Sequence, residues 1–472
     1  MHGSSAADGL RPPAASPHQR PGDLPLTRRL PNGLVLHALE ARHAPVVSLW
    51  IWYQVGGRNE VPGTTGMSHF LEHMLFKGTP LHPKGDLDRL LARYGASWNA
   101  FTNPDVTCYF ETVPRDRYLT ALELEADRMR EALIAPAEVE AERTVIVSER
   151  EGYENDPSFL LGEEVQAVAF ARHTYGQGVI GSKDEIKLMT RDGLHAHYRR
   201  FYSPANAYVV VVGDGEAEEL LLQAERAFAN VQGDAAPPPP QAPEPPQQGE
   251  KRVVVRRAGG ALPMVQLAFR APRATDPLSV ALSGLTVLLS GGSGAGEGAS
   301  GRSSRLYRAL VDAGLATETE ASFSLMKDPY LFWVEASLRP DVSHAAAEGA
   351  ILAELSRVAT EPLGDDEMAR VRRQMLAGTA YPTDTTTGRA YQLGQLLSSG
   401  AAHSIGEWYD RLASLSAEDL RAAAAATFVE RSRTVGWYVP DDHVASRPGA
   451  PTPGAAPPED PPEERREPED PP

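Results

Sequence analysis

The chain has 472 residues, of which 42% are hydrophobic, and its formal net charge is −17. This length provides for more than one hydrophobic core, since single cores usually stop growing at about 250–300 residues. The acidic balance argues against a general nucleic-acid-binding protein, which needs a basic face.

The cysteine content and the lack of long apolar runs indicate the cellular compartment of the protein. Cys108 is the only cysteine, so no disulfide can form within the chain. The sequence contains no run of about 18 apolar residues that could span a membrane. The first thirty residues also lack an apolar secretory segment. A cytoplasmic protein is therefore predicted, with a periplasmic one as the alternative if the start is mis-set or a signal has been trimmed.

Proline density divides the chain into two parts. The stretch "DAAPPPPQAPEPPQQGEKR" is too rich in proline for a helix or an inner strand and is typical of a stiff linker. The two parts are weakly similar, and each closes with a helix end followed by a strand. We expect two similar α+β domains, each with an antiparallel-rich sheet packed by helices. The predicted organisation is a disordered segment (1–23), an N-terminal domain (24–233), the linker (234–252), a C-terminal domain (253–443) and a disordered Pro/Glu-rich tail (444–472).

Periodicity predicts the elements of the first domain. Alternation of apolar and polar residues, with many Thr, Tyr and Phe, indicates a strand or hairpin at 98–113. Helices are predicted at 65–77, 84–94, 116–131 and 137–153.

The helix predicted at 65–77 has two different faces. One face is an apolar stripe that suits core packing. The opposite face carries His69, Glu72 and His73, again at helical spacing. The residues of the apolar stripe are Met67, Phe70, Leu71, Met74 and Leu75.

Histidines four residues apart on a helix project from adjacent turns and can bind one ion. A catalytic zinc site needs three protein ligands and an open position for water, whose proton a nearby carboxylate accepts. Glu72 is well placed as that base and poorly placed as a third ligand. The order H-x-x-E-H is the inverzincin pattern, although a solvated pair of histidines would show the same spacing.

A third ligand is expected from the helix predicted at 137–153. Glu142 and Glu149 lie on one face of this helix, on either side of an apolar pair, Val145 and Ile146. Two acids in such surroundings are unlike a solvated charged surface. Spacing alone does not choose between Glu142 and Glu149.

Three stretches together resemble a known family. "HFLEHMLFKGT", "GASWNAFTNPDVTCYF" and "ERTVIVSEREGYENDP" are similar to the pitrilysin/insulinase family of zinc endopeptidases. The similarity is greatest to the shorter, zinc-bearing subunits of the processing-peptidase type, and it extends from about Leu26 to Asp441. It implies a metalloendopeptidase that hydrolyses extended peptides or unfolded segments inside a closed chamber.

The resemblance also implies roles for individual residues. One Zn²⁺ per chain would be held by His69, His73 and Glu149, with Glu72 as the general base. Glu142 would support the site from behind the ligands. The edge strand that takes the peptide by main-chain pairing would be formed by Asn99, Ala100, Phe101 and Thr102.

One departure from the family bears on partners. Members carry an Arg and, seven residues later, a Tyr in the second domain, but this chain has Leu310 and Thr317 there. Nearby Arg305, Tyr307 and Arg308 stand at other positions. We therefore expect a heterodimer with a homologous zinc-less subunit that carries the Arg/Tyr pair, rather than a homodimer.

Two rival functions and one loop complete the sequence-based expectations. A non-catalytic scaffold or chaperone-like subunit would usually show a broken H-x-x-E-H motif, which is intact here. A binding module with a structural zinc would be rich in cysteine. The glycine-rich run at 290–302 is interpreted as a plain loop, with a flap over a cavity as the alternative.

Overall fold

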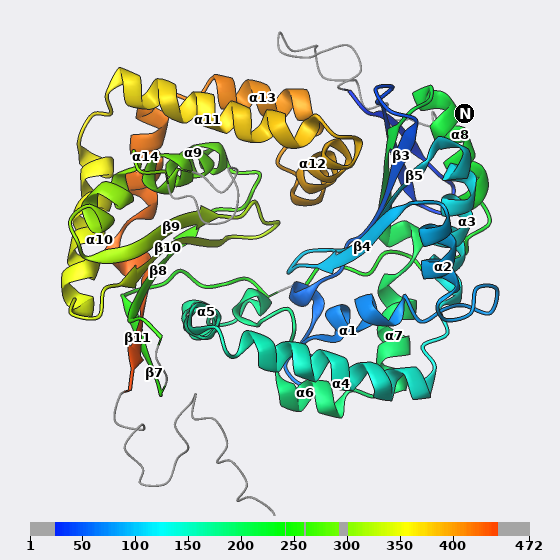
Figure 1. The fold of residues 1–472 in the computed structure, drawn as a ribbon, viewed down its shortest axis with the longest axis horizontal. Coiled ribbons are helices and arrows are strands. Elements are labelled where there is room, and N and C mark those ends of the chain that lie inside the picture. Colours follow the sequence, from blue (N-terminus) through cyan, green and yellow to red (C-terminus); the bar gives the residue numbers. More distant parts are fainter. Residues whose placement is uncertain (1–23, 241, 259–260, 292–300, 442–472) are drawn as a thin grey trace, which may run out of the picture.

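The chain folds into two halves that lie side by side (Figure 1). The computed structural model describes residues 24–240, 242–258, 261–291 and 301–441. The predicted terminal segments and most of the glycine-rich run therefore lie outside the described residues. None of the helices in the described part combines the length and the apolar character that a membrane crossing needs.

The first half contains a six-stranded sheet in the order β1-β2-β6-β3-β5-β4. All neighbours are antiparallel except β2 and β6. Strand β6 is buried along its whole length, as a run of valines predicts for a strand covered on both faces. The strands are β1 (Leu26–Arg29), β2 (Val35–Glu40), β3 (Val46–Tyr53), β4 (Ser97–Thr102), β5 (Thr107–Pro114) and β6 (Ala207–Gly213).

The second half contains a five-stranded sheet in the order β7-β11-β8-β10-β9. Its single parallel pair is β7 with β11. This order repeats that of β2-β6-β3-β5-β4, so the expectation of two similar α+β domains is confirmed. The strands are β7 (Lys251–Arg257), β8 (Met264–Ala271), β9 (Ala316–Phe323), β10 (Tyr330–Leu338) and β11 (Arg433–Pro440).

Helices cover the sheets of both halves. The first half contributes α1 (Met67–Met74), α2 (Asp86–Arg93), α3 (Tyr118–Glu131), α4 (Pro136–Tyr153), α5 (Pro157–Ala169), α6 (Lys183–Leu188), α7 (Arg191–Phe201) and α8 (Ala217–Phe228). The second half contributes α9 (Leu278–Ser290), α10 (His344–Thr360), α11 (Asp365–Thr383), α12 (Thr386–Ser399), α13 (Ile405–Ala413) and α14 (Ala417–Thr427).

One helix from each half packs on the sheet of the other half. Helix α12 packs on β3 and β6, while α5 packs on β11, β7 and β8. At the first contact, the hydroxyl of Tyr208 donates to the carbonyl of Gly394 at 2.8 Å. At the second, Gly436 leaves room for Val165, whose Cγ2 lies 2.3 Å from where a Cβ would stand. The exchange fixes the two halves relative to each other.

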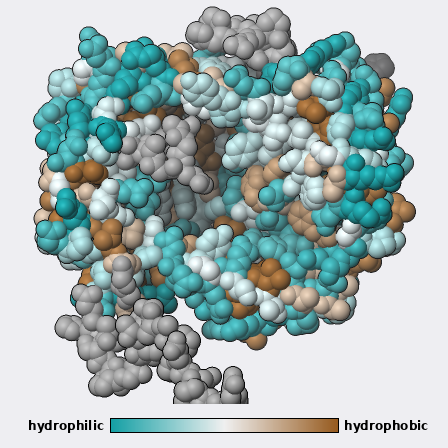
Figure 2. All heavy atoms as spheres, viewed as in Figure 1, coloured by the Kyte–Doolittle hydropathy of each residue, from teal (hydrophilic) through white to brown (hydrophobic). Residues whose placement is uncertain are grey.

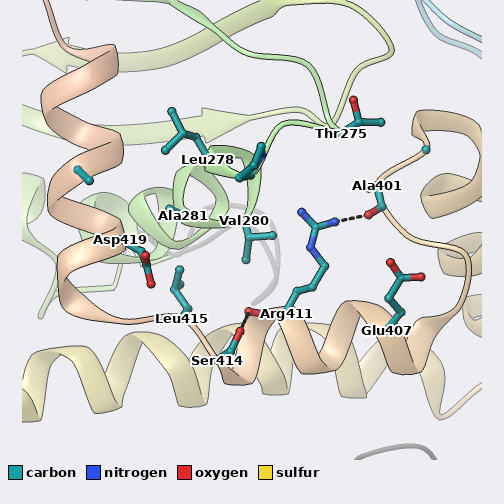
Figure 3. A pocket seen from close by; sticks show the side chains of 13 residues that line it. Thr275, Leu278, Val280, Ala281, Ala401, Glu407, Arg411, Ser414, Leu415 and Asp419 are labelled. Atoms are coloured by element: carbon teal, nitrogen blue, oxygen red, sulfur yellow. Dashed lines mark hydrogen bonds between the residues drawn. The ribbon is translucent and has the colours of Figure 1, made fainter. Parts of the chain in front are cut away.

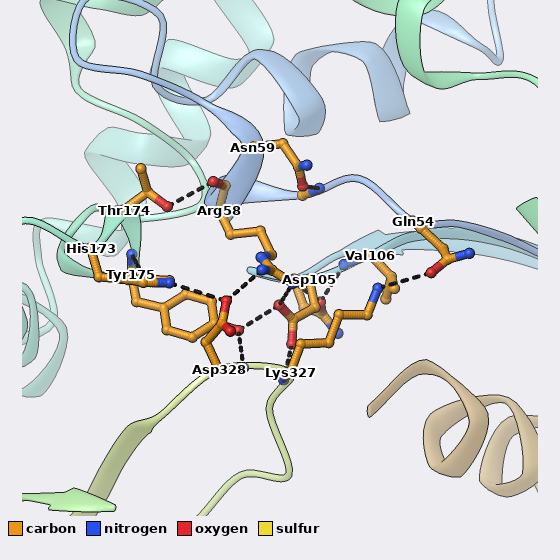
Figure 4. A network of polar contacts seen from close by, with 12 residues as sticks. Gln54, Arg58, Asn59, Asp105, Val106, His173, Thr174, Tyr175, Lys327 and Asp328 are labelled. Atoms are coloured by element: carbon orange, nitrogen blue, oxygen red, sulfur yellow. Dashed lines mark hydrogen bonds and ion pairs between the residues drawn. The ribbon is translucent and has the colours of Figure 1, made fainter. Parts of the chain in front are cut away.

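A buried polar network also joins the halves (Figure 4). Arg58 pairs with Asp328 from the β9–β10 connection, and its Nη1 lies 3.6 Å from Asp105 Oδ1. Asp105 accepts from the backbone N–H of Lys327 at 2.9 Å and from the hydroxyl of Tyr175 at 2.5 Å. The segments that precede α1 and follow β4 are thereby tied to the second half.

Most predicted elements of the first half are confirmed, with shifted ends. The hairpin at 98–113 is the pair β4 and β5. The helix expected at 65–77 is shorter. Gly66, with φ 89°, is its N-cap, and after Met74 the N–H groups of Phe76 and Lys77 donate to carbonyls three residues back, so the chain continues as a turn. The described residues of 234–250 form neither helix nor strand, but β7 begins at Lys251, inside the predicted linker, because it pairs with β11.

Candidate active site

Helix α1 has the two faces that its sequence predicts. Phe70, Leu71 and Met74 are fully buried in the core of the first half. On the other face, the side chains of His69 and His73 are 13% and 22% exposed, so they are accessible to a ligand. The apolar face therefore fixes the helix, and the polar face is free to bind.

Helix α4 packs against α1 and adds a carboxylate to this face. Glu149 Oε1 lies 3.7 Å from His69 Nε2, and Glu149 Oε2 lies 3.5 Å from His73 Nε2. The candidate ligand atoms of the three residues all lie within 4.8 Å of one another. Among the described residues, this is the one such group of His, Cys, Asp and Glu.

The geometry of the three side chains fits zinc. Zinc takes imidazole nitrogen and carboxylate oxygen at about 2.0–2.2 Å, which places the ligands of a tetrahedral site about 3.4 Å apart. The two His–Glu separations of 3.7 and 3.5 Å are close to this value. Burial, and the neighbouring His73, lower the pKa of His69 to about 4, so its imidazole is neutral at pH 7 and can donate a lone pair.

Glu142 lies behind the cluster and orients one ring. His73 Nδ1 lies 2.9 Å from Glu142 Oε1, which leaves Nε2 facing Glu149. Lys77 contacts the other Glu142 oxygen at 2.5 Å. Burial raises the pKa of Glu142, but the bonds from Lys77 and His73 outweigh it and hold the pKa below its usual value. The structure thus places Glu149 in the donor group and Glu142 outside it.

Glu72 lies beside the donors and is held by the edge strand. The hydroxyl of Thr102, the last residue of β4, donates to Glu72 Oε2 at 2.6 Å. Burial raises the pKa of Glu72, and Glu149 adds to this, while Thr102 and His73 act against it. A partly buried carboxylate with one oxygen occupied and a raised pKa is suited to accepting a proton.

The residues expected to bind peptide lie on strand β4. In the described sheet, β4 pairs with β5 alone, so its other edge is open to main-chain pairing. The Asn99 side chain accepts from the N–H of Ala100 at 2.8 Å. Phe101 points to the face opposite Thr102, where its ring lies 6.1 Å from that of Tyr391 in α12.

Neither position of the missing Arg/Tyr pair offers a free donor, and Arg305 and Arg308 both pair with Glu367. Leu310 is fully buried in the core of the second half, and the Thr317 hydroxyl donates to the carbonyl of Ser337 at 3.2 Å. Arg305 donates to Glu367 of α11 at 2.7 and 3.0 Å. The guanidinium of Arg305 is thus directed to the outer helices of its own half.

The described surface is hollowed between the two halves and also within the second half. The face in Figure 2 is hollowed between the two halves. A cavity of about 600 Å³ lies elsewhere, between α9, α13 and α14 of the second half. In its lining, Arg411 donates to the carbonyl of Ala401 (Figure 3). It shares no residue with the donors on α1 and α4.

Two family models match parts of both halves. The family described as Insulinase (Peptidase family M16) matches residues 36–183. The family described as Peptidase M16 inactive domain matches residues 189–375. The fold and these matches define the class of protein as one built from two similar α+β domains of the M16 type. The chain belongs to the insulinase family, peptidase family M16.

Relatives along most of the chain carry peptidase names. An uncharacterized zinc protease of Streptomyces coelicolor is 28% identical, over 84% of this chain and 85% of its own. A probable mitochondrial-processing peptidase subunit beta of Arabidopsis thaliana is 27% identical, over 87% and 78%. The crystal structure of a protease from Helicobacter pylori has a TM-score of 0.83 and 27% identity, covering 88% of this chain and 99% of that one.

Sequence reasoning missed two contacts of the site. The hydrogen bond from Thr102 to Glu72 joins a strand to a helix, and no local sequence pattern predicts it. The sequence predicts Lys77 as the last residue of a helix, and in the structure it pairs with Glu142, the carboxylate behind His73. Its position four residues after His73 is the one signal in the sequence that could have suggested this role.

Proposed function

We propose that the chain is the zinc-bearing, catalytic subunit of an endopeptidase, with one Zn²⁺ held by His69, His73 and Glu149. The grouping of two imidazoles and a carboxylate beside a base tied to an open strand edge is the observation that carries this proposal. Relatives named zinc proteases support it.

The side chains divide the work of peptide hydrolysis. When bound, zinc supplies Lewis-acid chemistry, acidifying water and polarising the scissile carbonyl group. Glu72 accepts the proton of the attacking water and passes it to the leaving amine. Thr102 holds the Glu72 carboxylate in place through its 2.6 Å hydrogen bond. Glu142 holds the His73 ring in the tautomer that presents Nε2.

The substrate class is an extended peptide or an unfolded segment. Such a chain would add to the open edge of β4 by main-chain hydrogen bonds, which gives affinity with broad tolerance of sequence. Because the Thr102 side chain contacts the base, a peptide paired along Asn99–Thr102 would pass next to Glu72. The hollow between the halves supports a chamber that would enclose the peptide.

The partner is a homologous, zinc-less subunit that brings the Arg/Tyr pair. An arginine and a tyrosine would donate to the oxyanion that forms during attack, a contribution of about 2.7–4 kcal/mol per donor. Leu310 has no donor, and the hydroxyl of Thr317 is engaged by Ser337. Both subunits of a homodimer would lack the Arg/Tyr pair, so a heterodimer is the assembly that supplies it.

A second candidate is a non-catalytic scaffold subunit of the same fold. The absence of the Arg/Tyr pair at Leu310 and Thr317 favours it, as does the description "inactive domain" of the family that matches residues 189–375. The complete donor group beside Glu72 favours the catalytic alternative.

Metal analysis of two matched variants tests the proposed zinc site. Wild type is expected to hold one zinc per chain after dialysis against a mild chelator. Glu149→Gln should lose the metal because it removes a charged ligand. Glu151→Gln changes an exposed acid two residues away, so it should retain zinc. Full occupancy in Glu149→Gln would show that the third ligand lies elsewhere.

A further inference from the structure

We propose that Glu60 is a positioning residue for the zinc-binding helix, because its carboxylate caps the N-terminus of α1. This inference rests on the proposed zinc site. Glu60 is 3% exposed. Its Oε2 accepts from the backbone N–H of Gly66 at 2.7 Å, and its Oε1 accepts from that of Ser68 at 2.6 Å. Each carboxylate oxygen thus serves one N–H group at the start of the helix.

Helix α1 cannot obtain this cap from its own N-cap residue. The first N–H groups of a helix have no partner within it, and a Ser, Thr, Asp or Asn side chain at the N-cap usually accepts from them. The N-cap of α1 is Gly66, in the left-handed region at φ 89°. A Cβ there would lie 2.3 Å from the carbonyl oxygen of Ile180. A side-chain cap at this position is sterically excluded, so the acceptor comes from Glu60.

A carboxylate is the strongest acceptor for this position. In its ionised form it makes charge-assisted bonds to both N–H groups and interacts favourably with the positive end of the helix dipole. Burial raises the pKa of Glu60 to about 7, and these bonds act against that rise. Ser68 precedes His69, which lies in the first turn of α1. Loss of the cap would loosen this turn, and with it the first of the two imidazoles. His73, one turn later, would be affected less.

Glu60 is itself held in place by the turn that precedes it. The short helix η1 (Gly57–Asn59) leads directly into Glu60. The backbone N–H of Arg58 donates to the carbonyl of Pro104 at 2.8 Å, and its guanidinium pairs with Asp328 of the second half (Figure 4). The carboxylate is therefore presented to α1 from a rigid segment.

The test compares Glu60→Gln with Glu185→Gln. The glutamine amide keeps one acceptor but turns an NH₂ group toward the other backbone N–H. Glu185 is the matched control, since it accepts from Gly63 N–H at 2.7 Å and Thr65 N–H at 2.9 Å in the adjacent loop without contacting α1. The zinc dissociation constant is measured by chelator competition, and the visible spectrum of the Co²⁺-substituted chain reports ligand geometry.

We expect Glu60→Gln to weaken zinc binding about tenfold or more, the range seen when groups that orient ligands are changed, and to alter the Co²⁺ spectrum. Glu185→Gln should change the dissociation constant less than threefold. A Glu60→Gln chain that is less stable but binds zinc within twofold of wild type would overturn the inference, as would equal losses in both variants. Wild type that binds no zinc would instead refute the proposed function.

A measurement on the wild-type chain covers the case in which Glu60→Gln does not fold. The amides of Gly66 and Ser68 should exchange with deuterium slowly in the metal-free wild type, because Glu60 occupies both. Exchange of these two amides at the rate of an uncapped helix end would contradict the proposed cap.

Discussion

Replacement of Gly394 by alanine tests how tightly the two halves are packed. A Cβ at this position of α12 would lie 2.3 Å from two ring carbons of Trp52, well inside contact distance. Trp52 is fully buried and its ring lies 5.8 Å from that of Trp50 and 5.9 Å from that of Tyr208. The indole therefore has no space into which it could move.

The expected cost follows from this geometry. Overpacking of a tight core costs about 1–3 kcal/mol, while Gly→Ala inside a helix gains about 1 kcal/mol of propensity. Separation of α12 from the sheet would also weaken the 2.8 Å bond from Tyr208 to the Gly394 carbonyl. We expect the melting temperature to fall by several degrees, since about 1 kcal/mol shifts it by roughly 2–4 °C in a domain of this size.

A helical glycine without neighbours provides the control. A Cβ at Gly378 of α11 would meet nothing within 4 Å, so Gly378→Ala should leave the melting temperature equal or higher. Scanning calorimetry on both variants, at one scan rate because unfolding of large chains is often irreversible, measures the difference. Gly394→Ala as stable as Gly378→Ala would refute the packing described for α12.

Two further predictions concern assembly and pH. The isolated chain should hydrolyse an unstructured peptide weakly, and a similar chain that lacks the zinc motif but has the Arg/Tyr pair should activate it strongly. Robust, Glu72-dependent hydrolysis by the isolated chain would contradict the heterodimer. Burial lowers the pKa of His37 to about 4, below the unfolded value of about 6.5. The stability from neutral His37 is therefore present above pH 6.5 and lost as pH falls toward 4, up to about 3 kcal/mol. The melting temperature of His37→Phe minus that of wild type should therefore be larger at pH 4.5 than at pH 7.5. An equal difference at both pH values would show that His37 does not cause the loss of stability in acid.

The sequence predicted the site where local periodicity carries the information. The spacing of His69, Glu72 and His73 predicted a polar face opposite an apolar one, and the structure shows both faces. The spacing of Glu142 and Glu149 left the third donor open, because both lie on one side of α4. In the structure, Glu142 contacts His73 Nδ1 and Glu149 faces His73 Nε2. This difference depends on how α4 crosses α1, which the sequence does not show.

Tertiary contacts limited what else could be predicted. Glu60 stands six residues before Gly66, outside any capping pattern that links a residue to the third one after it. The exchange of α5 and α12 between the halves depends on close approach at Gly436 and Gly394. A glycine in a strand or helix pattern indicates such a close approach, but the sequence does not identify the side chain that packs against it.

Glu72→Gln is the variant that tests the central claim most directly. Zinc content, peptide binding and cleavage are compared in wild type, Glu72→Gln and the control Glu151→Gln, each combined with the zinc-less subunit. Because Glu72 is the base and not a ligand, Glu72→Gln should keep one zinc per chain and still bind peptide. Its cleavage rate should fall by about 10² or more, a typical share for a positioned general base, while Glu151→Gln cleaves normally. Turnover by Glu72→Gln close to that of wild type would contradict the account.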